Sequence, residues 1–382
     1  MTTILEHSGG LEKYLIQTAK NLSNHSDVKI DVITMDDKTT ELIVGLLTFY
    51  YFKKLDRKSI YQEDSQEIIK ELGKARYYKC HSFSELKTKL NQYDVIYSKN
   101  ELIESFIFKF IIGYKNIPPV IFGCHTPILY PITSSLQSKM HNFLYGGYVY
   151  KFLASGVRYF HVVNLDDENS IKHIFPKVPF KKIYNPFDFN KFTKYSSLDK
   201  NDIFFDKNKV NIIWIGRLTE QKGVDDLCTI VASVNSSTLR NKIIWNIAGD
   251  GEEKKLIVDL AKEWNNVRHL GWIKNRNMAN VIRNNNLFIN TSKWEGFPYS
   301  VLEAQAVGLP VIAYDIGGCS DIIDNNKNGV LVKDRESFVE AIKEFVNGKK
   351  NFVDVRKYIS TKFDKNMLYE QLIEVFEDVK RI

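Results

Sequence analysis

Short apolar runs alternate with stretches of helical spacing along most of this chain, as in an α/β protein. The clearest example begins with Leu287–Asn290, an apolar run that predicts a buried strand. In Tyr299–Val307 the apolar side chains are three and four residues apart, which predicts a helix. Gly308 and Pro310 end that helix, and Val311–Tyr314 predicts the next strand. We therefore expect a strand–loop–helix–strand unit of a parallel sheet here.

The same alternation recurs on both sides of the middle of the chain. At the start, two glycines separate a very short apolar segment from a run of helical spacing. Further strands are predicted at Val28–Thr34, Tyr93–Tyr97, Pro118–Phe122, Val157–Asn164, Val210–Ile215, Ile243–Glu252 (strand and turn) and Val267–Ile273. A chain of 382 residues is long enough for two domains of ordinary size.

Two carboxylates bracket the loop and helix of the central unit. Glu295 lies in the loop after the first strand, and Glu303 lies inside the helix. The loop between them offers backbone N–H groups at a helix N-terminus, which favours an anion. Acids at both ends and an anion cradle between them suit a nucleotide sugar. The alternative is that Glu295 caps the helix and Glu303 is a charge on its surface.

These residues resemble the signature of glycosyltransferase family 4, retaining enzymes of the two-Rossmann, B-type fold. The resemblance is carried by Glu295-Gly296-Phe297-Pro, by Glu303, and by Gly308-Leu-Pro-Val-Ile-Ala. It implies an α/β chain of two Rossmann-like parallel-sheet domains that face each other across a cleft. It also implies that the first Glu lies against the transferred sugar and that the second holds the ribose hydroxyls. We expect Gly296 and Phe297 to line the donor site.

Two basic residues follow the strand that opens the second half. Arg217 and Lys222 bracket one turn after Ile215, next to Gly216. A bidentate guanidinium and an ammonium at this place can bind a diphosphate. The turn is not a Walker loop, because Gly-Lys-Ser/Thr is absent. It is similar to the Gly-Arg…Lys-Gly turn of the family, which implies that both bases bind the donor; ordinary surface charge is the alternative.

A second glycine turn of this half is also similar to the family. Gly249 and Gly251 lack the third glycine of a dinucleotide fingerprint, since position 254 is Lys. The resemblance implies instead a Gly-x-Gly-Glu turn that lines the nucleotide pocket. It further implies that the segment with Trp272 and Ile273 holds the base, mostly through its backbone.

The first half carries a thinner resemblance. Gly9 and Gly10 allow a backbone to approach a ligand at a helix start, although an ordinary tight turn explains them as well. His125 follows a predicted strand, where open α/β sheets bind ligands, although lone histidines are often structural. In the family, a Gly-Gly turn faces the donor phosphates, and a post-strand His reaches the transferred sugar. We assign these expected roles to Gly9, Gly10 and His125.

The polar stretch Lys191–Lys209 predicts a linker. We place an acceptor-binding domain at residues 1–195, a nucleotide-sugar-binding domain at 196–362, and a C-terminal helix at 363–382. The resemblance implies that this helix crosses back to the first domain. Asn185-Pro-Phe-Asp188 is similar to the family's Asn-Pro-x-Asp segment at the domain crossing.

Composition narrows the partners. The net charge is +7, and most of the excess falls in residues 1–200, which suits an anionic lipid surface or acceptor. Nucleic acid is the rival partner, but no nucleic-acid-binding signature is evident. In Leu42–Lys58 an apolar run, an aromatic cluster and basic residues follow one another; we expect either an anionic membrane contact or a core helix.

Four cysteines without metal or disulfide spacing fit a reducing cytosol, and no apolar run is long enough to span a membrane. We expect a cytoplasmic protein that is peripheral on the inner face of the cell membrane.

The expected function is a metal-independent, retaining transfer of a sugar from a UDP- or GDP-linked donor. The acceptor is a saccharide, lipid-linked, in bacterial envelope polysaccharide or glycolipid synthesis. No separate cofactor and no metal are expected, since an Asp-x-Asp pair is absent and Arg217 and Lys222 take the metal's place. The alternatives are a sugar-nucleotide epimerase or phosphorylase on the same fold, and a non-catalytic sugar-nucleotide-binding subunit of a transferase complex.

Overall fold

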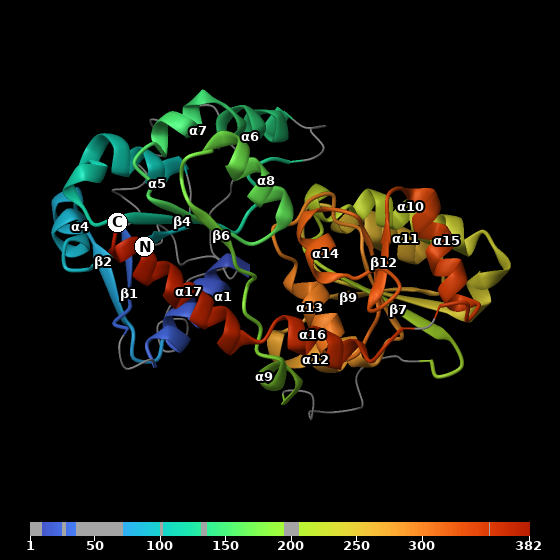
Figure 1. The fold of residues 1–382 in the computed structure, drawn as a ribbon. Coiled ribbons are helices and arrows are strands. Elements are labelled where there is room, and N and C mark those ends of the chain that lie inside the picture. Colours follow the sequence, from blue (N-terminus) through green and yellow to red (C-terminus); the bar gives the residue numbers. More distant parts are fainter. Residues whose placement is uncertain are drawn as a thin grey trace. The chain divides into compact units, whose positions relative to one another are not determined.

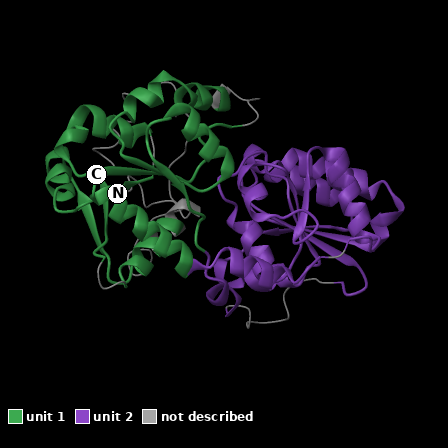
Figure 2. Ribbon diagram, viewed as in Figure 1, with its two compact units in different colours: residues 1–186, 366–382 green, residues 187–365 purple. Residues whose placement is uncertain are grey.

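The computed structural model describes residues 10–24, 28–35, 72–99, 102–130, 136–194, 206–350 and 352–382. These form two compact units, residues 1–186 with 366–382 and residues 187–365 (Figure 2). The predicted first strand, Gly9 and Leu42–Lys58 lie outside the described residues.

The first unit is an α/β unit built on short parallel strands. Strands β3, β4, β5 and β6 form one sheet in that order, and β1 pairs with β2 in a second sheet. The strands are β1 (Asp31–Met35), β2 (Arg76–Cys80), β3 (Ile96–Ser98), β4 (Val120–Cys124), β5 (Tyr159–Val162) and β6 (Phe180–Lys182). The helices are α1 (Gly10–Leu22), α4 (Phe83–Leu90), α5 (Leu102–Phe106), the π-helical turn η1 (Ile107–Ile112), the 3₁₀ turn η2 (Tyr114–Asn116), α6 (Leu136–Gly146), α7 (Tyr148–Leu153) and α8 (Leu165–Ile174).

The second unit has one parallel sheet of six strands in the order β12-β11-β10-β7-β8-β9. The strands are β7 (Val210–Ile215), β8 (Ile243–Ala248), β9 (Val267–Gly271), β10 (Leu287–Asn290), β11 (Val311–Tyr314) and β12 (Gly329–Val332). The helices are α9 (Phe189–Lys194), η4 (Glu220–Lys222), α10 (Val224–Asn235), η5 (Thr238–Lys242), α11 (Lys254–Glu263), α12 (Asn275–Arg283), α13 (Tyr299–Ala306), α14 (Gly317–Ile322), α15 (Arg335–Val346) and α16 (Val355–Lys362).

Helices cover both faces of this six-stranded sheet. Figure 1 shows α10, α11 and α15 on one side of it and α12, α13 and α16 on the other. The strands are therefore buried on both faces, as the mostly apolar runs in β7, β8, β10 and β11 predict. The order of the strands is that of a Rossmann fold, with the reversal of order between β7 and β10.

The C-terminal helix α17 (Lys365–Lys380) belongs largely to the first unit. The hydroxyl of Tyr369 accepts a hydrogen bond from the side-chain amide of Asn21 at 3.1 Å. Lys181 pairs with Glu374 at 2.7 Å, and Lys380 pairs with Asp94 at 3.1 Å. These contacts fix α17 against α1, β6 and the turn before β3, which lie 193 and more residues earlier in the chain.

The compact units divide the chain earlier than the boundary that we predicted at residues 195 and 196. The predicted linker begins with a helix, α9, whose residues lie in the second unit. Asp188 explains the difference, because its carboxylate accepts the backbone N–H of Lys191 at 2.9 Å and pairs with Lys365 at 2.6 Å. The ring of Phe187 packs 6.3 Å from that of Tyr299. The chain therefore changes units at Pro186.

Candidate functional site

The reversal of strand order in the second unit brings two predicted motifs together. Strands β7 and β10 are hydrogen-bonded neighbours, so the turn after Ile215 and the loop after Asn290 lie at the same edge of the sheet. Ligands of open α/β sheets bind at this place, beyond the carboxyl ends of the two strands where the order reverses. We call residues 216–223 and 291–298 the switch-point loops.

Glycines allow the backbones of these loops to touch. Gly223 has a φ of +63°, and a Cβ there would lie 2.0 Å from the carbonyl oxygen of Thr291. Gly249, at the end of β8, has a φ of +150°, and its Cβ would lie 1.9 Å from the carbonyl oxygen of Gly216. Any side chain at either position would force the loops apart. Gly223 and Gly249 are therefore needed for the shape of the turns.

Hydrogen bonds lock the two switch-point loops to each other. The indole N–H of Trp214 donates to the Thr291 hydroxyl at 2.9 Å, and that hydroxyl donates to the carbonyl of Lys222 at 2.9 Å. The backbone N–H of Lys293 donates to the carbonyl of Gln221 at 2.8 Å. Side chains carried by these loops are held in place before any ligand binds.

Lys222 and Glu295 form an ion pair across the two loops. The Glu295 side chain is 7% exposed and that of Lys222 is 17% exposed. The hydroxyl of Ser292 donates to the same carboxylate oxygen at 2.7 Å. We predicted that these two charged residues bind different parts of a ligand, and the structure instead brings them together. An ammonium has three donors, so Lys222 can hold Glu295 and still bind an anion.

Arg217 is arranged differently. Its side chain is exposed at the start of the turn, and its guanidinium makes no hydrogen bond or ion pair with any part of the chain that the structure describes. A guanidinium that can make a bidentate contact is thus left available at the edge of the sheet where β7 ends. This is the arrangement expected of a cation that binds a phosphate group.

Helix α13 begins in the second switch-point loop. Pro298 precedes its first residue, and no side chain caps its first turn. Its backbone N–H groups can therefore meet an anion. Glu303 lies half-buried in the middle of α13, while Val301, Leu302, Ala304 and Ala306 are buried as the helical spacing predicts.

Phe297 is turned away from any ligand of the loop. Its side chain is 6% exposed, and its ring lies 5.6 Å from that of Phe363. Gly296 is buried beneath α14, since a Cβ on Gly318 would lie 2.4 Å from the carbonyl oxygen of Gly296. Burial thus commits the Phe297 side chain to packing, and Gly296 can offer a bound nucleotide only its backbone.

Trp272 and Ile273 follow β9 at the edge of the sheet. The backbone N–H of Gly249 donates to the carbonyl of Gly271 at 2.8 Å, which joins this segment to the Gly249 turn. Trp272 is 63% exposed, and Ile273 is half-buried. The indole of Trp272 is therefore free to pack against a planar ring, and the backbone of Ile273 lies beside it.

The predicted histidine of the first unit is buried in a hydrogen-bonded chain. Nε2 of His125 lies 2.8 Å from the hydroxyl of Tyr97, and Nδ1 lies 3.0 Å from the Asn185 side chain. The same hydroxyl of Tyr97 lies 2.6 Å from Nδ1 of His161. Nε2 of His161 lies 2.7 Å from the carbonyl oxygen of Ile183. The centre of the Tyr14 ring lies 4.0 Å from that of the His125 ring, and the two planes are tilted by 42°.

The positions of the protons in this series of hydrogen bonds follow from the acceptors at its two ends. The carbonyl of Ile183 can only accept, so Nε2 of His161 carries the proton and Nδ1 accepts from Tyr97. The side-chain oxygen of Asn185 can likewise only accept, so Nδ1 of His125 carries the proton of that ring and donates to it.

Burial keeps both rings neutral. Desolvation lowers the pKa of His161 to about 4. Desolvation, and then the neighbouring His161, hold the pKa of His125 well below its ordinary value. Desolvation likewise raises the pKa of Tyr97 well above 10. With both of its nitrogens bonded, His125 has to open one hydrogen bond before it can contact a ligand.

We did not predict Tyr97, His161 or Ser292 from the sequence. Gly123 was the available signal, because it lies in the middle of a buried strand. A Cβ on Gly123 would lie 2.1 Å from the hydroxyl oxygen of Tyr97, so the glycine makes room for that ring. Glycine inside a strand marks such a close approach. Gly10 begins α1, while Gly9 lies outside the described residues.

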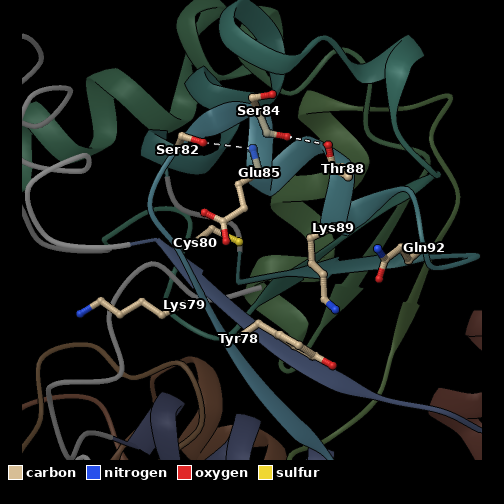
Figure 3. Close-up of a pocket in the computed structure, with 9 residues that line it drawn as sticks. All are labelled: Tyr78, Lys79, Cys80, Ser82, Ser84, Glu85, Thr88, Lys89 and Gln92. Carbon is tan, nitrogen blue, oxygen red and sulfur yellow. Dashed lines mark hydrogen bonds between the residues drawn. The ribbon is translucent and has the colours of Figure 1, made fainter.

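A cavity of about 470 Å³ lies elsewhere in the first unit, beside β2 and α4 (Figure 3). The hydroxyl of Ser82 accepts the backbone N–H of Glu85 at 3.2 Å, and the hydroxyl of Thr88 donates to the carbonyl of Ser84 at 2.9 Å. The ammonium of Lys89 lies 3.3 Å from the centre of the Tyr78 ring. These polar groups are engaged in α4 and its surroundings, and the cavity contains no predicted site residue.

Within the described ranges, no three His, Cys, Asp or Glu side chains are grouped to hold a metal ion. The search for a helix long and apolar enough to cross a membrane found none among those residues.

Curated proteins match parts of this chain in sequence. An uncharacterized 41.2 kDa protein of the cps region of Klebsiella pneumoniae is 29% identical over 208 residues, which is 53% of this chain and 56% of the relative. The UDP-Gal:alpha-D-GlcNAc-diphosphoundecaprenol alpha-1,3-galactosyltransferase of Escherichia coli is 28% identical over 194 residues, 47% of this chain and 48% of the enzyme. The chain thus spans about half the length of the curated relatives it matches.

Solved structures extend the comparison to the whole chain. Anabaena HepE, crystallised with UDP-glucose, superposes with a TM-score of 0.68 at 17% identity over 99% of this chain and 98% of HepE. The lipopolysaccharide outer core galactosyltransferase WaaB superposes with a TM-score of 0.67 at 17% identity over the same shares. The chain therefore has the two-Rossmann fold of these glycosyltransferases, and its residues 196–362, which carry both switch-point loops, match the family Glycosyl transferases group 1.

Proposed function

We propose that this chain is a retaining glycosyltransferase of family 4. It moves a sugar from a nucleotide sugar to a saccharide acceptor, lipid-linked, in bacterial envelope polysaccharide or glycolipid synthesis. The observation that carries the proposal is the pair of cations at the switch point. Arg217 is exposed there without a partner among the described residues, and Lys222 lies in the same turn beside Glu295.

The diphosphate of the donor binds between these cations and the start of α13. Arg217 makes a bidentate contact, Lys222 contributes a point charge, and the uncapped first turn of α13 offers backbone N–H groups. All three stabilise the negative charge that grows on the leaving diphosphate. They supply the charge that a divalent ion supplies in metal-dependent transferases, so we propose that the reaction needs no metal.

The acids at either side of the diphosphate bind the two sugar rings. Glu295 contacts the transferred sugar, and its charge stabilises the positive charge that develops at the anomeric carbon. Glu303 accepts hydrogen bonds from the ribose hydroxyls. The base packs beside Trp272 and the backbone of Ile273, close to the Gly249 turn.

The bond between the anomeric carbon and the diphosphate breaks as the acceptor oxygen attacks from the same face. The electron pair leaves with the diphosphate, and the proton of the acceptor hydroxyl passes to the departing phosphate oxygen. This front-face course retains the anomeric configuration without a nucleophilic side chain. His125 takes part as a neutral imidazole, after it exchanges one of its two hydrogen bonds for a sugar hydroxyl.

Three relatives and neighbours support the donor and the acceptor. The E. coli galactosyltransferase is named for UDP-Gal and a diphosphoundecaprenol acceptor, HepE was crystallised with UDP-glucose, and WaaB is named for the lipopolysaccharide outer core. We infer a UDP-linked donor first and a GDP-linked donor second. A lipid-linked acceptor places the protein on the inner face of the cell membrane.

The purified chain tests the proposal directly. It is incubated with UDP-, GDP- and ADP-sugars and with a synthetic N-acetylglucosaminyl diphosphate lipid. We expect one nucleotide series to raise the melting temperature, one sugar to be added to the lipid with retained configuration by NMR, and excess chelator to leave the rate unchanged. Isomerised donor without transfer would indicate the epimerase alternative. Donor binding with neither hydrolysis nor transfer would indicate the non-catalytic subunit.

A further inference from the structure

The first unit exposes aromatic side chains that its own core does not use. Phe110 and Ile111 of η1 are 56% and 38% exposed, and Tyr148, Val149 and Phe152 of α7 are 91%, 38% and 55% exposed. We call these five residues the aromatic face. The rings of Phe110 and Phe152 lie 5.9 Å apart, so η1 and α7 contribute to one continuous surface.

Folding does not account for this exposure. Helix α7 buries Tyr150 and Leu153, and the ring of Tyr150 packs 5.3 Å from that of Phe175. Its inner face is thus already committed to the core of the unit, while Tyr148, Val149 and Phe152 point outward. A soluble surface rarely leaves several large apolar side chains together unless they bind a partner.

The exposed charges of the two segments that carry the aromatic face, residues 102–130 and 136–164, have one sign. Lys109 lies with its ammonium 4.7 Å from the centre of the Phe152 ring and donates to the Ser155 hydroxyl at 2.7 Å. Lys115, Lys151 and Arg158 are exposed on the same segments. In the described residues 102–130 and 136–164 the only carboxylate is that of Glu104, which is fully buried and bonded to Ser98.

We propose that the aromatic face docks this chain onto an anionic lipid bilayer. Aromatic rings partition into the interfacial layer of a membrane, and lysines beside them meet anionic headgroups. A second copy of this chain fits less well, because a two-fold contact through this surface would bring two patches of positive charge together. The proposal rests on the proposed function for its lipid-linked acceptor, and it names a surface other than Leu42–Lys58.

The test is sedimentation of the full chain with vesicles of phosphatidylcholine, with and without phosphatidylglycerol. We expect binding to the anionic vesicles that weakens with salt. Phe110→Ser with Phe152→Ser, and separately Lys115→Glu with Lys151→Glu, should each lower the bound fraction at least tenfold. The matched controls are Leu256→Ser with Val353→Ser and Lys207→Glu with Lys242→Glu, at exposed positions of the second unit, and they should bind as the wild type does.

Each outcome decides something. Wild-type protein that stays in solution with anionic vesicles, or variants of the face that sediment undiminished, would overturn the proposal. Analytical ultracentrifugation could instead show a wild-type dimer that the Phe110/Phe152 variant does not form. The aromatic face would then be a self-association surface, and this result too would overturn the proposal. Nucleotide-sugar binding by the second unit is measured separately by thermal shift. Absence of nucleotide-sugar binding contradicts the proposed function, whereas the result of vesicle sedimentation tests only the role of the aromatic face.

Discussion

The two candidate sites of this molecule are built in opposite ways. At the switch point of the second unit, charges are kept: Lys222 and Glu295 form an ion pair, and Arg217 is exposed beside them. In the first unit, His125 and His161 are neutral, and each ring nitrogen already has a hydrogen-bond partner. Charged groups with spare hydrogen-bond donors can bind an anion. Neutral side chains whose polar atoms are already hydrogen-bonded to one another instead hold the elements around them in place. The difference predicts which substitutions affect chemistry and which affect folding.

Glu295→Gln is the most severe test of this contrast. It removes the charge that we propose to face the anomeric carbon, and the transfer rate should fall about 10²- to 10³-fold, the usual loss when one electrostatic contact to a transition state is removed. Initial rates at saturating donor measure the effect. Glu340→Gln, at an exposed position of α15, is the control and should not change the rate. Undiminished transfer by Glu295→Gln would remove Glu295 from the site.

The buried, neutral histidines of the first unit predict that its stability depends on pH. In the folded protein the pKa of His161 is about 4, below its ordinary value of 6.5, so between these values only the unfolded chain binds the proton. Stability is thus complete above pH 6.5 and falls as the pH drops toward 4, by on the order of 3 kcal/mol for this histidine. Hydrogen exchange of β4 and β5 amides at pH 7 and pH 5 measures the change.

Two histidine variants and tryptophan fluorescence separate the effect of His161 from other effects of pH. His161→Gln should reduce the pH dependence and leave the part that comes from buried His125, while His173→Gln, at an exposed position, should not change it. All five tryptophans lie in residues 187–365, so tryptophan fluorescence reports the second unit alone. A loss of protection in β4 and β5 that is the same in wild type and in His161→Gln would contradict the assignment.

The smallest expected effects separate the two cations of the switch point. Arg217→Met should weaken UDP binding about tenfold and leave the melting temperature unchanged, because the guanidinium makes no contact within the described chain. Lys222→Met should weaken binding similarly and also lower the melting temperature, since Glu295 then stays buried without its partner. Calorimetric titration and thermal unfolding measure both, with Lys255→Met as the exposed control. Equal melting temperatures for the two variants would contradict the ion pair.

Much of the second unit could be predicted from its sequence. The strands at Val210–Ile215, Leu287–Asn290 and Val311–Tyr314 have the predicted bounds, because a strand buried on both faces is a short and mostly apolar run. Helix α13 also has its predicted start, since the pattern of apolar residues and the stop at Gly308 are local features. Helix α9 was missed, although its cap Asp188 is local, because its ion pair with Lys365 and its aromatic packing depend on distant residues.

The candidate site divides along the same line. From the sequence we selected Arg217, Lys222 and Glu295 as candidate residues of one site, because their charges and the glycines beside them resemble the motifs of a known family. Only the tertiary structure paired Lys222 with Glu295, which are 73 residues apart, and Tyr97 with His161, which are 64 apart. Those partners are chosen by which strands lie side by side and in which register. Strand order and register are set by the packing of the whole sheet, so no local pattern contains them.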